Sequence, residues 1–283
     1  MFDTPQTTEP LAAVETEMRR LLGRGRIAEL AAAHLDSGGS RARALLATDT
    51  AVRIGLPDNT AAAIAACCEL LHNASLIHDD IQDGDSSRRG QPALWEAHGS
   101  AAAICAGDLM ISAAWGALAA MPGDTAAPAV AMVHEAVATT IDGQAEDIAA
   151  CSEIPFERTL AIASAKSAPL LALPVRLSLT AARIDADTLA QRAAVAVAIA
   201  YQIADDVTDR DRDRAAASPN ACLALEHEGH TADAARDAAI LRARAALTEA
   251  RVLAADIPED GGGGLASLAD KVEHKLDEVA DAA

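Results

Sequence analysis

Residues 61–83 read AAAIAACCELLHNASLIHDDIQD, a long apolar run that ends in a cluster of carboxylates. Alanine is the strongest helix former and leucine is close behind it, so this composition predicts a helix over residues 61–83. Asp79 and Asp83 are four residues apart, and side chains at that spacing lie on one face of a helix. Because like charges at this spacing destabilise a helix by roughly 0.2–0.5 kcal/mol, a functional reason for the pair is expected.

A second cluster with the same spacing, Asp205-Asp206-Val207-Thr208-Asp209, follows the apolar stretch 193–204. One such cluster alone is more simply a solvated helix terminus. Two matching clusters favour a cage of oxygen ligands, if their helices face each other across a bundle. Carboxylates of this kind suit Mg²⁺, which keeps several waters and bridges to substrate phosphates. The predicted metal ligands are Asp79, Asp83, Asp205 and Asp209, with Asp80 and Asp206 as further catalytic residues.

The composition indicates an all-α protein and restricts its partners. Half of the residues (51%) are hydrophobic but only 2% are aromatic, so the core must consist of Ala, Leu, Val and Ile. The formal net charge is −19. Such a charge repels nucleic acids and anionic lipid surfaces, and neither is an expected partner. A local group of cations is therefore informative, and Arg88-Arg89 lies just after the first aspartate cluster.

The helix signals indicate one domain over residues 11–283, after a flexible N-terminus at 1–10. The segment 101–120 is the most membrane-like, but it carries Asp108 at its centre, where a charge is costly in a bilayer. We therefore expect no stable membrane insertion and, without an apolar signal core near the N-terminus, a cytoplasmic protein. The predicted helices cover residues 11–22, 27–35, 61–83, 100–120, 126–150, 156–164, 166–180, 187–209, 231–255 and 265–279.

Together these motifs resemble the polyprenyl (trans-isoprenyl) diphosphate synthase family. The segment 69–83 with Arg88-Arg89-Gly90 is similar to the family's first aspartate-rich motif and its arginine pair. Gly38-Gly39-Ser40-Arg41-Ala42-Arg43 is similar to an early Gly-Gly-Lys-Arg-x-Arg motif. The resemblance extends over residues 38–209. Its remaining matches, in family order, are Gly107-Asp108, Gly143-Gln144 with Asp147, Lys166-Ser167 and Tyr201-Gln202 before the second aspartate cluster.

The resemblance implies a fold and a reaction. The fold is the isoprenoid synthase fold, a bundle of roughly ten or more helices around a central cavity, usually in a homodimer. The reaction joins isopentenyl diphosphate to an allylic diphosphate and needs Mg²⁺. By resemblance, the allylic diphosphate is held by Arg88, Lys166, Ser167 and Gln202, with Lys166 also counted as catalytic. The isopentenyl diphosphate is held by Arg43, His72 and Arg89.

The length of the product is expected to depend on Ala74 and Ser75. On a helix that rises about 1.5 Å per residue, they lie roughly 6–7.5 Å before Asp79. Both side chains are small, which leaves room for a growing isoprenoid tail. The sequence therefore predicts a product of the geranylgeranyl class or longer.

Two departures from the family pattern leave alternatives open. Ser40 replaces the Lys of the early motif, and residues 210–220 lack the Lys that usually follows the second aspartate motif. These losses suggest a non-catalytic regulatory subunit, although both aspartate motifs are complete. A class I terpene cyclase is the other alternative. Such pockets usually need aromatic faces for their cations, and the chain has two Trp, one Tyr and two Phe.

Overall fold

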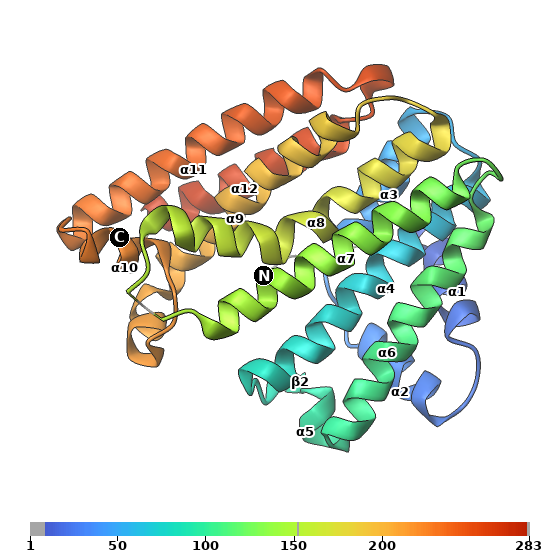
Figure 1. The fold of residues 1–283 in the computed structure, drawn as a ribbon, viewed down its shortest axis with the longest axis horizontal. Helices are drawn as coiled ribbons and strands as arrows, with labels where there is room; N and C mark the ends of the chain where they lie inside the picture. The colour runs from blue at the N-terminus through green and yellow to red at the C-terminus, as the bar shows by residue number, and fades with distance from the viewer. Residues whose placement is uncertain (1–8, 152, 282–283) are drawn as a thin grey trace. The chain divides into compact units, whose positions relative to one another are not determined.

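A computed structural model describes residues 9–151 and 153–281 of the chain. In these residues the structure is almost entirely helical, with two short strands that form a hairpin (Figure 1). The all-α prediction is confirmed. The elements are α1 Glu9–Leu22, α2 Arg26–Asp36, α3 Ala42–Arg53, α4 Asp58–Asp83, β1 Ser87–Arg88, β2 Gln91–Pro92, α5 Leu94–His98, α6 Ser100–Ala117, η1 Leu118–Ala120, α7 Ala126–Ala149, α8 Phe156–Ala182, α9 Asp187–Ala216, α10 Ala221–His227, α11 Ala232–Ala255, η2 Pro258–Asp260 and α12 Gly263–Asp281.

The chain divides into two compact units. One contains Met1–Val133 and Leu177–Asp185, and the other contains His134–Arg176 and Ala186–Ala283. In the first unit α4 packs against α1, α3 and α6, and in the second α9 packs against α10, α11 and α12. The single domain expected over 11–283 stays a prediction. Of the expected flexible N-terminus, residues 1–8 lie outside the described part of the chain.

Helix α4 carries the first aspartate cluster at its C-terminal end. It begins after Pro57, which takes an extended conformation (φ −60°, ψ 142°). It ends at Gly84, whose left-handed conformation (φ 72°) suits the residue after a helix. Most side chains between its ends are buried, which anchors the helix in the core of its unit. The cluster is thus held at a defined helix terminus.

Two helices are longer than the sequence indicates. We predicted separate helices over 156–164 and 166–180, but α8 is continuous through Pro169 and Pro174. The missing N–H of Pro169 removes only the bond to the Ala165 carbonyl. We predicted the end of α9 near residue 209, but it continues to Ala216. Arg212 pairs with Asp209 one turn earlier, with 2.9 Å between Nη2 and Oδ2, which supports this extension.

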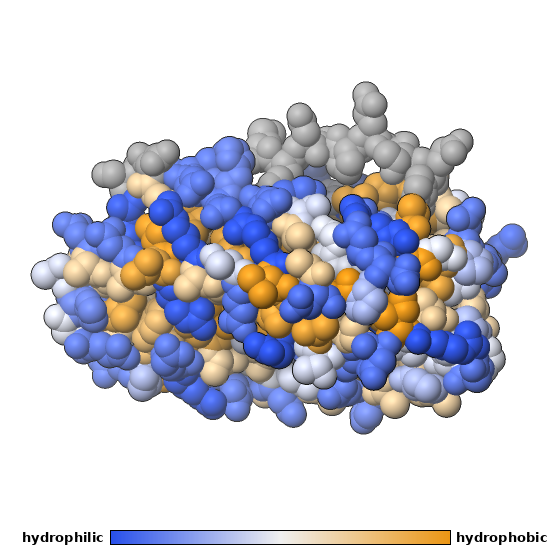
Figure 2. Space-filling view, turned by 90° about the horizontal axis from the view of Figure 1, so that it is seen from above, coloured by the Kyte–Doolittle hydropathy of each residue, from blue (hydrophilic) through white to orange (hydrophobic). Residues whose placement is uncertain are grey.

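Three helices are long and apolar enough to cross a membrane by length and composition: Asp58–Asp83, Ser100–Ala120 and Phe156–Ala182. In the first of these, 78% of the most apolar window is buried in the protein. The face of the molecule in Figure 2 mixes hydrophilic and hydrophobic residues. The absence of membrane insertion stays a prediction.

The backbones of α7 and α8 approach closely at Gly143. A β-carbon at this position would lie 2.4 Å from the Lys166 nitrogen and 2.9 Å from the Ala165 oxygen. Backbone atoms cannot move aside as the end of a side chain can. We therefore expect Gly143→Ala to lower the free energy of unfolding by about 1–3 kcal/mol, as overpacking does elsewhere.

Gly116→Ala on α6 is the matched control, measured in the same denaturant titration. Its β-carbon would meet only Leu21 Cδ2, at an ordinary 3.5 Å. It should be neutral or stabilising by up to about 1 kcal/mol, because Ala favours a helix more than Gly does. Equal stability of the two variants would contradict the close approach.

Candidate active site

In the first aspartate motif, the middle carboxylate points into the protein. Asp80 is fully buried, whereas Asp79 is half-buried and Asp83 is exposed. Asp80 Oδ1 accepts a hydrogen bond from Arg88 Nε at 2.8 Å and a second one from Arg88 Nη2. Burial raises the pKa of Asp80, and the hydrogen bonds from Arg88 oppose that change. Asp80 therefore forms an ion pair with Arg88, the arginine that follows the motif.

The same contacts fix the hairpin after α4. The Asp85 N–H donates to the Asp80 carbonyl at 2.9 Å, and Trp95 Nε1 donates to the Asp85 carbonyl at 2.8 Å. Arg88 lies on β1, opposite Gln91. The hairpin therefore holds the side chains of Arg88 and Arg89 close to the end of α4.

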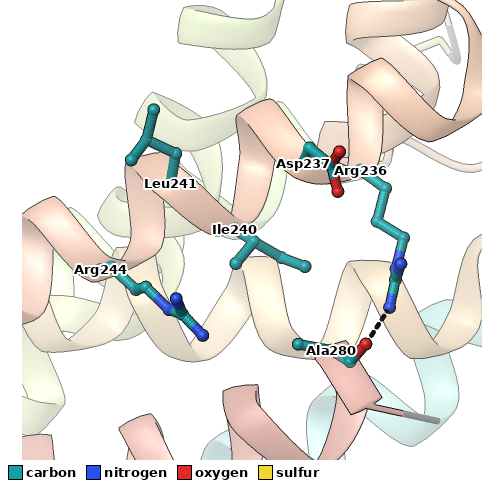
Figure 3. Close-up of a pocket in the computed structure, with 6 residues that line it drawn as sticks. All are labelled: Arg236, Asp237, Ile240, Leu241, Arg244 and Ala280. Carbon is teal, nitrogen blue, oxygen red and sulfur yellow. Dashed lines mark hydrogen bonds between the residues drawn. The ribbon is translucent and has the colours of Figure 1, made fainter. Parts of the chain in front are cut away.

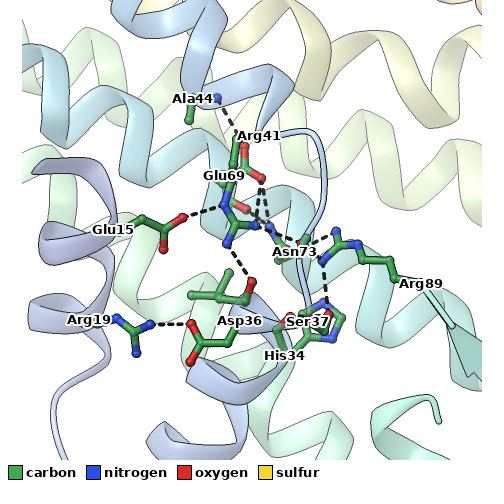
Figure 4. Close-up of polar contacts among 12 residues, drawn as sticks. Glu15, Arg19, His34, Asp36, Ser37, Arg41, Ala44, Glu69, Asn73 and Arg89 are labelled. Atoms are coloured by element: carbon green, nitrogen blue, oxygen red, sulfur yellow. Dashed lines mark hydrogen bonds and ion pairs between the residues drawn. The ribbon is translucent and has the colours of Figure 1, made fainter. Parts of the chain in front are cut away.

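The early motif places Arg41 in a structural role (Figure 4). Arg41 is buried and left-handed (φ 51°) just before α3. Its guanidinium donates to Glu15 at 2.6 Å and to the Leu35 carbonyl at 2.6 Å, and it lies 3.7 Å from Glu69. The Glu69 carboxylate also accepts from the Ala44 N–H at 3.2 Å. This network joins α1, α2, α3 and α4 of the first unit.

Arg89 is left-handed (φ 54°), and its side chain lies against the loop before α3. It donates to the Gly38 carbonyl, and its remaining acceptors are Ser37 Oγ at 3.5 Å and Asn73 Oδ1 at 3.4 Å. A β-carbon on Gly39, whose φ is +118°, would lie 2.7 Å from the guanidinium carbon. The glycine pair of the early motif therefore makes room for Arg89 (Figure 4).

The residues predicted to bind isopentenyl diphosphate lie near one another. Burial lowers the pKa of His72 well below its usual value, and the charges of Arg43 and Arg89 lower it further. His34 adds to this effect. His34 and Asn73 were not among the predicted site residues. The sequence could have indicated both, because each is a polar residue within an apolar stretch of helix.

In the second aspartate motif, the middle carboxylate is again buried. Asp206 Oδ1 accepts from Gln202 Nε2 at 2.7 Å, and Oδ2 accepts from the Ala221 N–H at 2.8 Å. Asn220 donates to the Asp206 carbonyl at 2.8 Å. Burial raises the pKa of Asp206 to about 7 despite these hydrogen bonds. Gln202, predicted to hold the allylic diphosphate, is here bonded to Asp206.

The outer carboxylates of the second motif are paired with cations. Lys275 from α12 donates to Asp205, and its ammonium lies 4.3 Å from the centre of the Tyr201 ring. Asp209 is paired with Arg212. Burial raises the pKa of Asp205, and Lys275 opposes that change. Lys275 therefore brings an ammonium group to the motif whose usual downstream Lys is missing.

The Lys166-Ser167 pair lies on α8 in the second unit. Lys166 Nζ donates to Asp147 Oδ2 at 2.8 Å, and Ser167 is half-buried. One turn before Asp147, Gln144 is buried on α7, and neither polar atom of its amide has a hydrogen-bond partner among the described residues. The Lys166 ammonium is thus positioned by a carboxylate of the Gly143-Gln144 motif.

Ala74 and Ser75 lie on α4 before the first motif. Ala74 is buried, and the hydroxyl of half-buried Ser75 donates to the His72 carbonyl at 2.8 Å. Gly107 on α6 lies against His78, because a β-carbon there would be 2.3 Å from His78 Nε2. The Gly-Asp motif thus makes room for the imidazole beside Asp79.

A pocket of about 420 Å³ lies in the second unit, between α11 and the end of α12 (Figure 3). Its two arginines tie α11 to α12. Arg236 donates to the Ala280 carbonyl at 2.6 Å, and Arg244 donates to Asp277 at 2.9 Å. None of the predicted site residues lines it, so we assign it no part in the chemistry. Its lining consists of Arg236, Asp237, Ile240, Leu241, Arg244 and Ala280.

The donor set of the two motifs fits a hard divalent cation. All donors are carboxylate oxygens, which Mg²⁺ and Ca²⁺ prefer. Among the described residues, no three His, Cys, Asp or Glu side chains are grouped as a ready metal site. Because Mg²⁺ keeps several waters and uses few protein ligands, a pair of aspartates on one helix face is a suitable anchor. The roles of the individual residues stay predictions.

Loss of Arg41 should be strongly destabilising. Arg41→Ala would leave Glu69, which is 1% exposed, without its nearby cation and the Leu35 carbonyl without its donor. Breaking a buried ion pair from one side costs about 3–5 kcal/mol. The exposed pair of Arg19 with Asp36 is the control, and Arg19→Ala should cost less than about 1 kcal/mol in the same chemical denaturation series. Similar losses in both variants would show that the network does not hold the unit together.

Comparison with known proteins assigns the chain to a family. The polyprenyl synthetase family profile matches residues 25–231. A farnesyl diphosphate synthase of Mycobacterium tuberculosis is 32% identical over 60% of this chain and 48% of its own length, so the chain spans about half of that relative. A probable farnesyl diphosphate synthase of Bradyrhizobium diazoefficiens is 30% identical over 83% of this chain and 72% of its own.

Solved structures show the same fold. A geranylgeranyl pyrophosphate synthetase from Pyrococcus horikoshii has a TM-score of 0.84 at 23% identity, over 93% of this chain and 95% of its own. A polyprenyl synthase from Caulobacter crescentus, complexed with calcium and isoprenyl diphosphate, has a TM-score of 0.77 at 22% identity, over 93% of this chain and 94% of its own. The fold is thus that of the isoprenoid synthases, and the chain belongs to the polyprenyl synthetase family.

Proposed function

We propose that this protein is a Mg²⁺-dependent trans-prenyltransferase that joins isopentenyl diphosphate to an allylic diphosphate. The observation that carries the proposal is the pairing, on α4, of a carboxylate cluster with a basic cluster of two arginines and a histidine. Asp79 and Asp83 end the helix, while Arg43, Arg89 and His72 gather around its preceding turns. In a chain with a net charge of −19, such a basic cluster calls for an anionic ligand.

Two clusters of opposite charge suit two diphosphates bound in different ways. Carboxylates bind a diphosphate only through a divalent cation, whereas guanidinium and imidazole groups bind phosphate oxygens directly. We assign the allylic diphosphate to the aspartate motifs, and the isopentenyl diphosphate to Arg43, His72 and Arg89. The Caulobacter relative, complexed with calcium and isoprenyl diphosphate, supports this pairing of cation and diphosphate.

The reaction breaks the allylic carbon–oxygen bond, and negative charge then develops on the leaving diphosphate. Bound Mg²⁺ would supply Lewis-acid stabilisation of that charge. Lys166 and Arg88 add fixed positive charge, and Asp147 and Asp80 hold these cations in position. The isopentenyl double bond attacks the allylic carbon, and loss of a proton completes the product. No nucleophilic side chain is required.

Turnover should depend on both aspartate motifs and on the metal. Purified protein with Mg²⁺, isopentenyl diphosphate and C5, C10 or C15 allylic diphosphates should give a longer prenyl diphosphate. We expect Asp79→Asn and Asp205→Asn each to lower kcat on the order of 10²–10³-fold, because charge stabilisation in the transition state is lost. The control is Asp211→Asn, since that side chain is 90% exposed and needs no role in the reaction.

The same assay separates the alternatives. Hydrocarbon products without consumption of isopentenyl diphosphate would identify a terpene cyclase. Lack of turnover with every allylic substrate would indicate a regulatory subunit. Full turnover in the presence of a chelator would contradict the proposed metal dependence.

We further propose a product of the geranylgeranyl class, formed by a cytoplasmic homodimer. Ala74 and Ser75 would line the path of the growing tail, and neither side chain is large enough to stop it. Ala74→Phe should shorten the main product by one or more isoprene units, as measured by chromatography of the dephosphorylated alcohols. Ala62→Phe, earlier on α4, is the control: it tests whether an aromatic side chain anywhere on this helix is enough to shorten the product. An unchanged product from folded Ala74→Phe protein would exclude Ala74 from the path.

A further inference from the structure

Arginines of the first unit near the candidate site differ in whether a carboxylate neutralises them. Arg41 is neutralised by Glu15 and Glu69, and Arg88 by Asp80. In the described part of the chain, no carboxylate lies within ion-pair distance of Arg89, whose acceptors are a carbonyl, a hydroxyl and an amide oxygen. Burial lowers the pKa of Arg89, and the charge of Arg41 adds to this effect. The surroundings of Arg89 therefore favour an anion.

His34 lies near Arg89, and one nitrogen of its ring has no hydrogen-bond partner among the described residues. It belongs to the last turn of α2 and is 7% exposed. Among the described residues, its Nε2 has no hydrogen-bond partner. A buried polar atom without a hydrogen-bond partner is unfavourable, and a bound ligand would satisfy it. The charged and titratable groups around His34 are Arg41, Arg88, Arg89 and His72.

Asn73 can act toward His34 only as an acceptor. Its amide nitrogen donates to the Glu69 carbonyl at 2.8 Å and to the Glu69 carboxylate at 3.2 Å, and its oxygen accepts from Arg89 Nη2 at 3.4 Å. A neutral imidazole has one N–H and one lone pair. We place the N–H of His34 on Nδ1, which leaves the lone pair on the unpartnered Nε2.

We propose that His34 binds the diphosphate of isopentenyl diphosphate through Nε2, and that this nitrogen takes up one proton from solvent when the anion enters. The inference rests on the proposed function and adds a residue to its isopentenyl site. In the structure, burial together with the charges of Arg89 and Arg88 lowers the pKa of His34 to about 4, so the ring is neutral. A diphosphate beside it reverses the sign of the local field and favours the charged ring.

The proposal also accounts for Ser40. Ser40 follows Gly39, whose backbone lies against the Arg89 guanidinium, and it brings no charge to the loop. A protonated His34 would supply a cation only when the anion is present. Without the anion, the neutral His34 adds no positive charge that would repel Arg41, Arg88 and Arg89.

Calorimetric titration of the full chain with isopentenyl diphosphate tests the inference, near pH 6.5 and without Mg²⁺ or allylic substrate. Buffers of low and high ionisation enthalpy report the protons taken up. We expect His34→Gln to weaken binding about tenfold or more, as loss of a charge-assisted hydrogen bond does. We also expect wild type to take up more protons than this variant, by up to one. His98→Gln, at an exposed position at the end of α5, is the control and should match wild type.

Nitrogen-15 NMR of histidine-labelled wild type gives a second readout that needs no folded variant. Addition of isopentenyl diphosphate should move one imidazole from the neutral to the protonated chemical shift. Histidine signals that all keep their charge state, or equal affinity and proton uptake in wild type and His34→Gln, would overturn the inference.

Steady-state kinetics separates this inference from the proposed function. His34→Gln should raise KM for isopentenyl diphosphate about tenfold and leave KM for the allylic substrate unchanged. Wild-type turnover with an unchanged KM in His34→Gln would overturn the role of His34 alone. A wild-type protein that forms no product would overturn the proposed function.

Discussion

The buried middle aspartate of each motif is the constraint on which the candidate site depends. Asp80 is bonded to Arg88, and Asp206 is bonded to Gln202 and to the Ala221 N–H. In both motifs this carboxylate connects the helix to the segment that follows it. On a helix the first and last aspartates, four residues apart, lie close to one line, and the middle one lies about 100° around the axis from the first. The inward bond of the middle aspartate therefore sets the rotation of the pair that we assign to the metal.

A strongly acidic chain must also control where its cations lie. Most arginines and lysines near the motifs have a carboxylate partner, as Lys166 has Asp147 and Lys275 has Asp205. Arg89 instead lies against neutral acceptors, between two histidines of lowered pKa. Cations with a carboxylate partner are held in position by it, whereas a cation with only neutral acceptors keeps its charge available for an anionic ligand. The first unit therefore combines, along one helix, the end that we assign to a divalent cation and the cluster that we assign to an anion.

The sequence predicted those parts of the structure that local chemistry determines. The helix that ends at Asp83 follows from its alanine-rich run and Gly84, and the proximity of Arg43, His72 and Arg89 followed from the family motifs. The continuity of α8 could not be predicted from Pro169, because whether a proline ends a helix depends on what packs against it. Gly143 of α7 lies against the backbone of α8 at Ala165 and Lys166, one turn before Pro169.

Residues that join the site through tertiary structure were also missed. Lys275 reaches Asp205 from the last helix, and His34 on α2 lies within the field of Arg89 and Arg88. Neither belongs to a motif with a recognisable spacing. Arg41 lies within the recognised early motif. The motif alone does not show that Arg41 has a left-handed backbone or that its side chain pairs with Glu15 and Glu69. Charge and spacing thus identify the motifs, while burial decides what each residue does there.

Equilibrium binding of an unreactive allylic thiolodiphosphate tests whether the outer aspartates of both motifs hold one diphosphate through divalent cations, as we propose. Binding should be tight with Mg²⁺, be lost on chelation, and be weakened by replacement of either Asp79 or Asp205. If the analogue binds equally well without metal, or if either replacement leaves its Mg²⁺-dependent affinity unchanged, the aspartate motifs do not act together on the diphosphate.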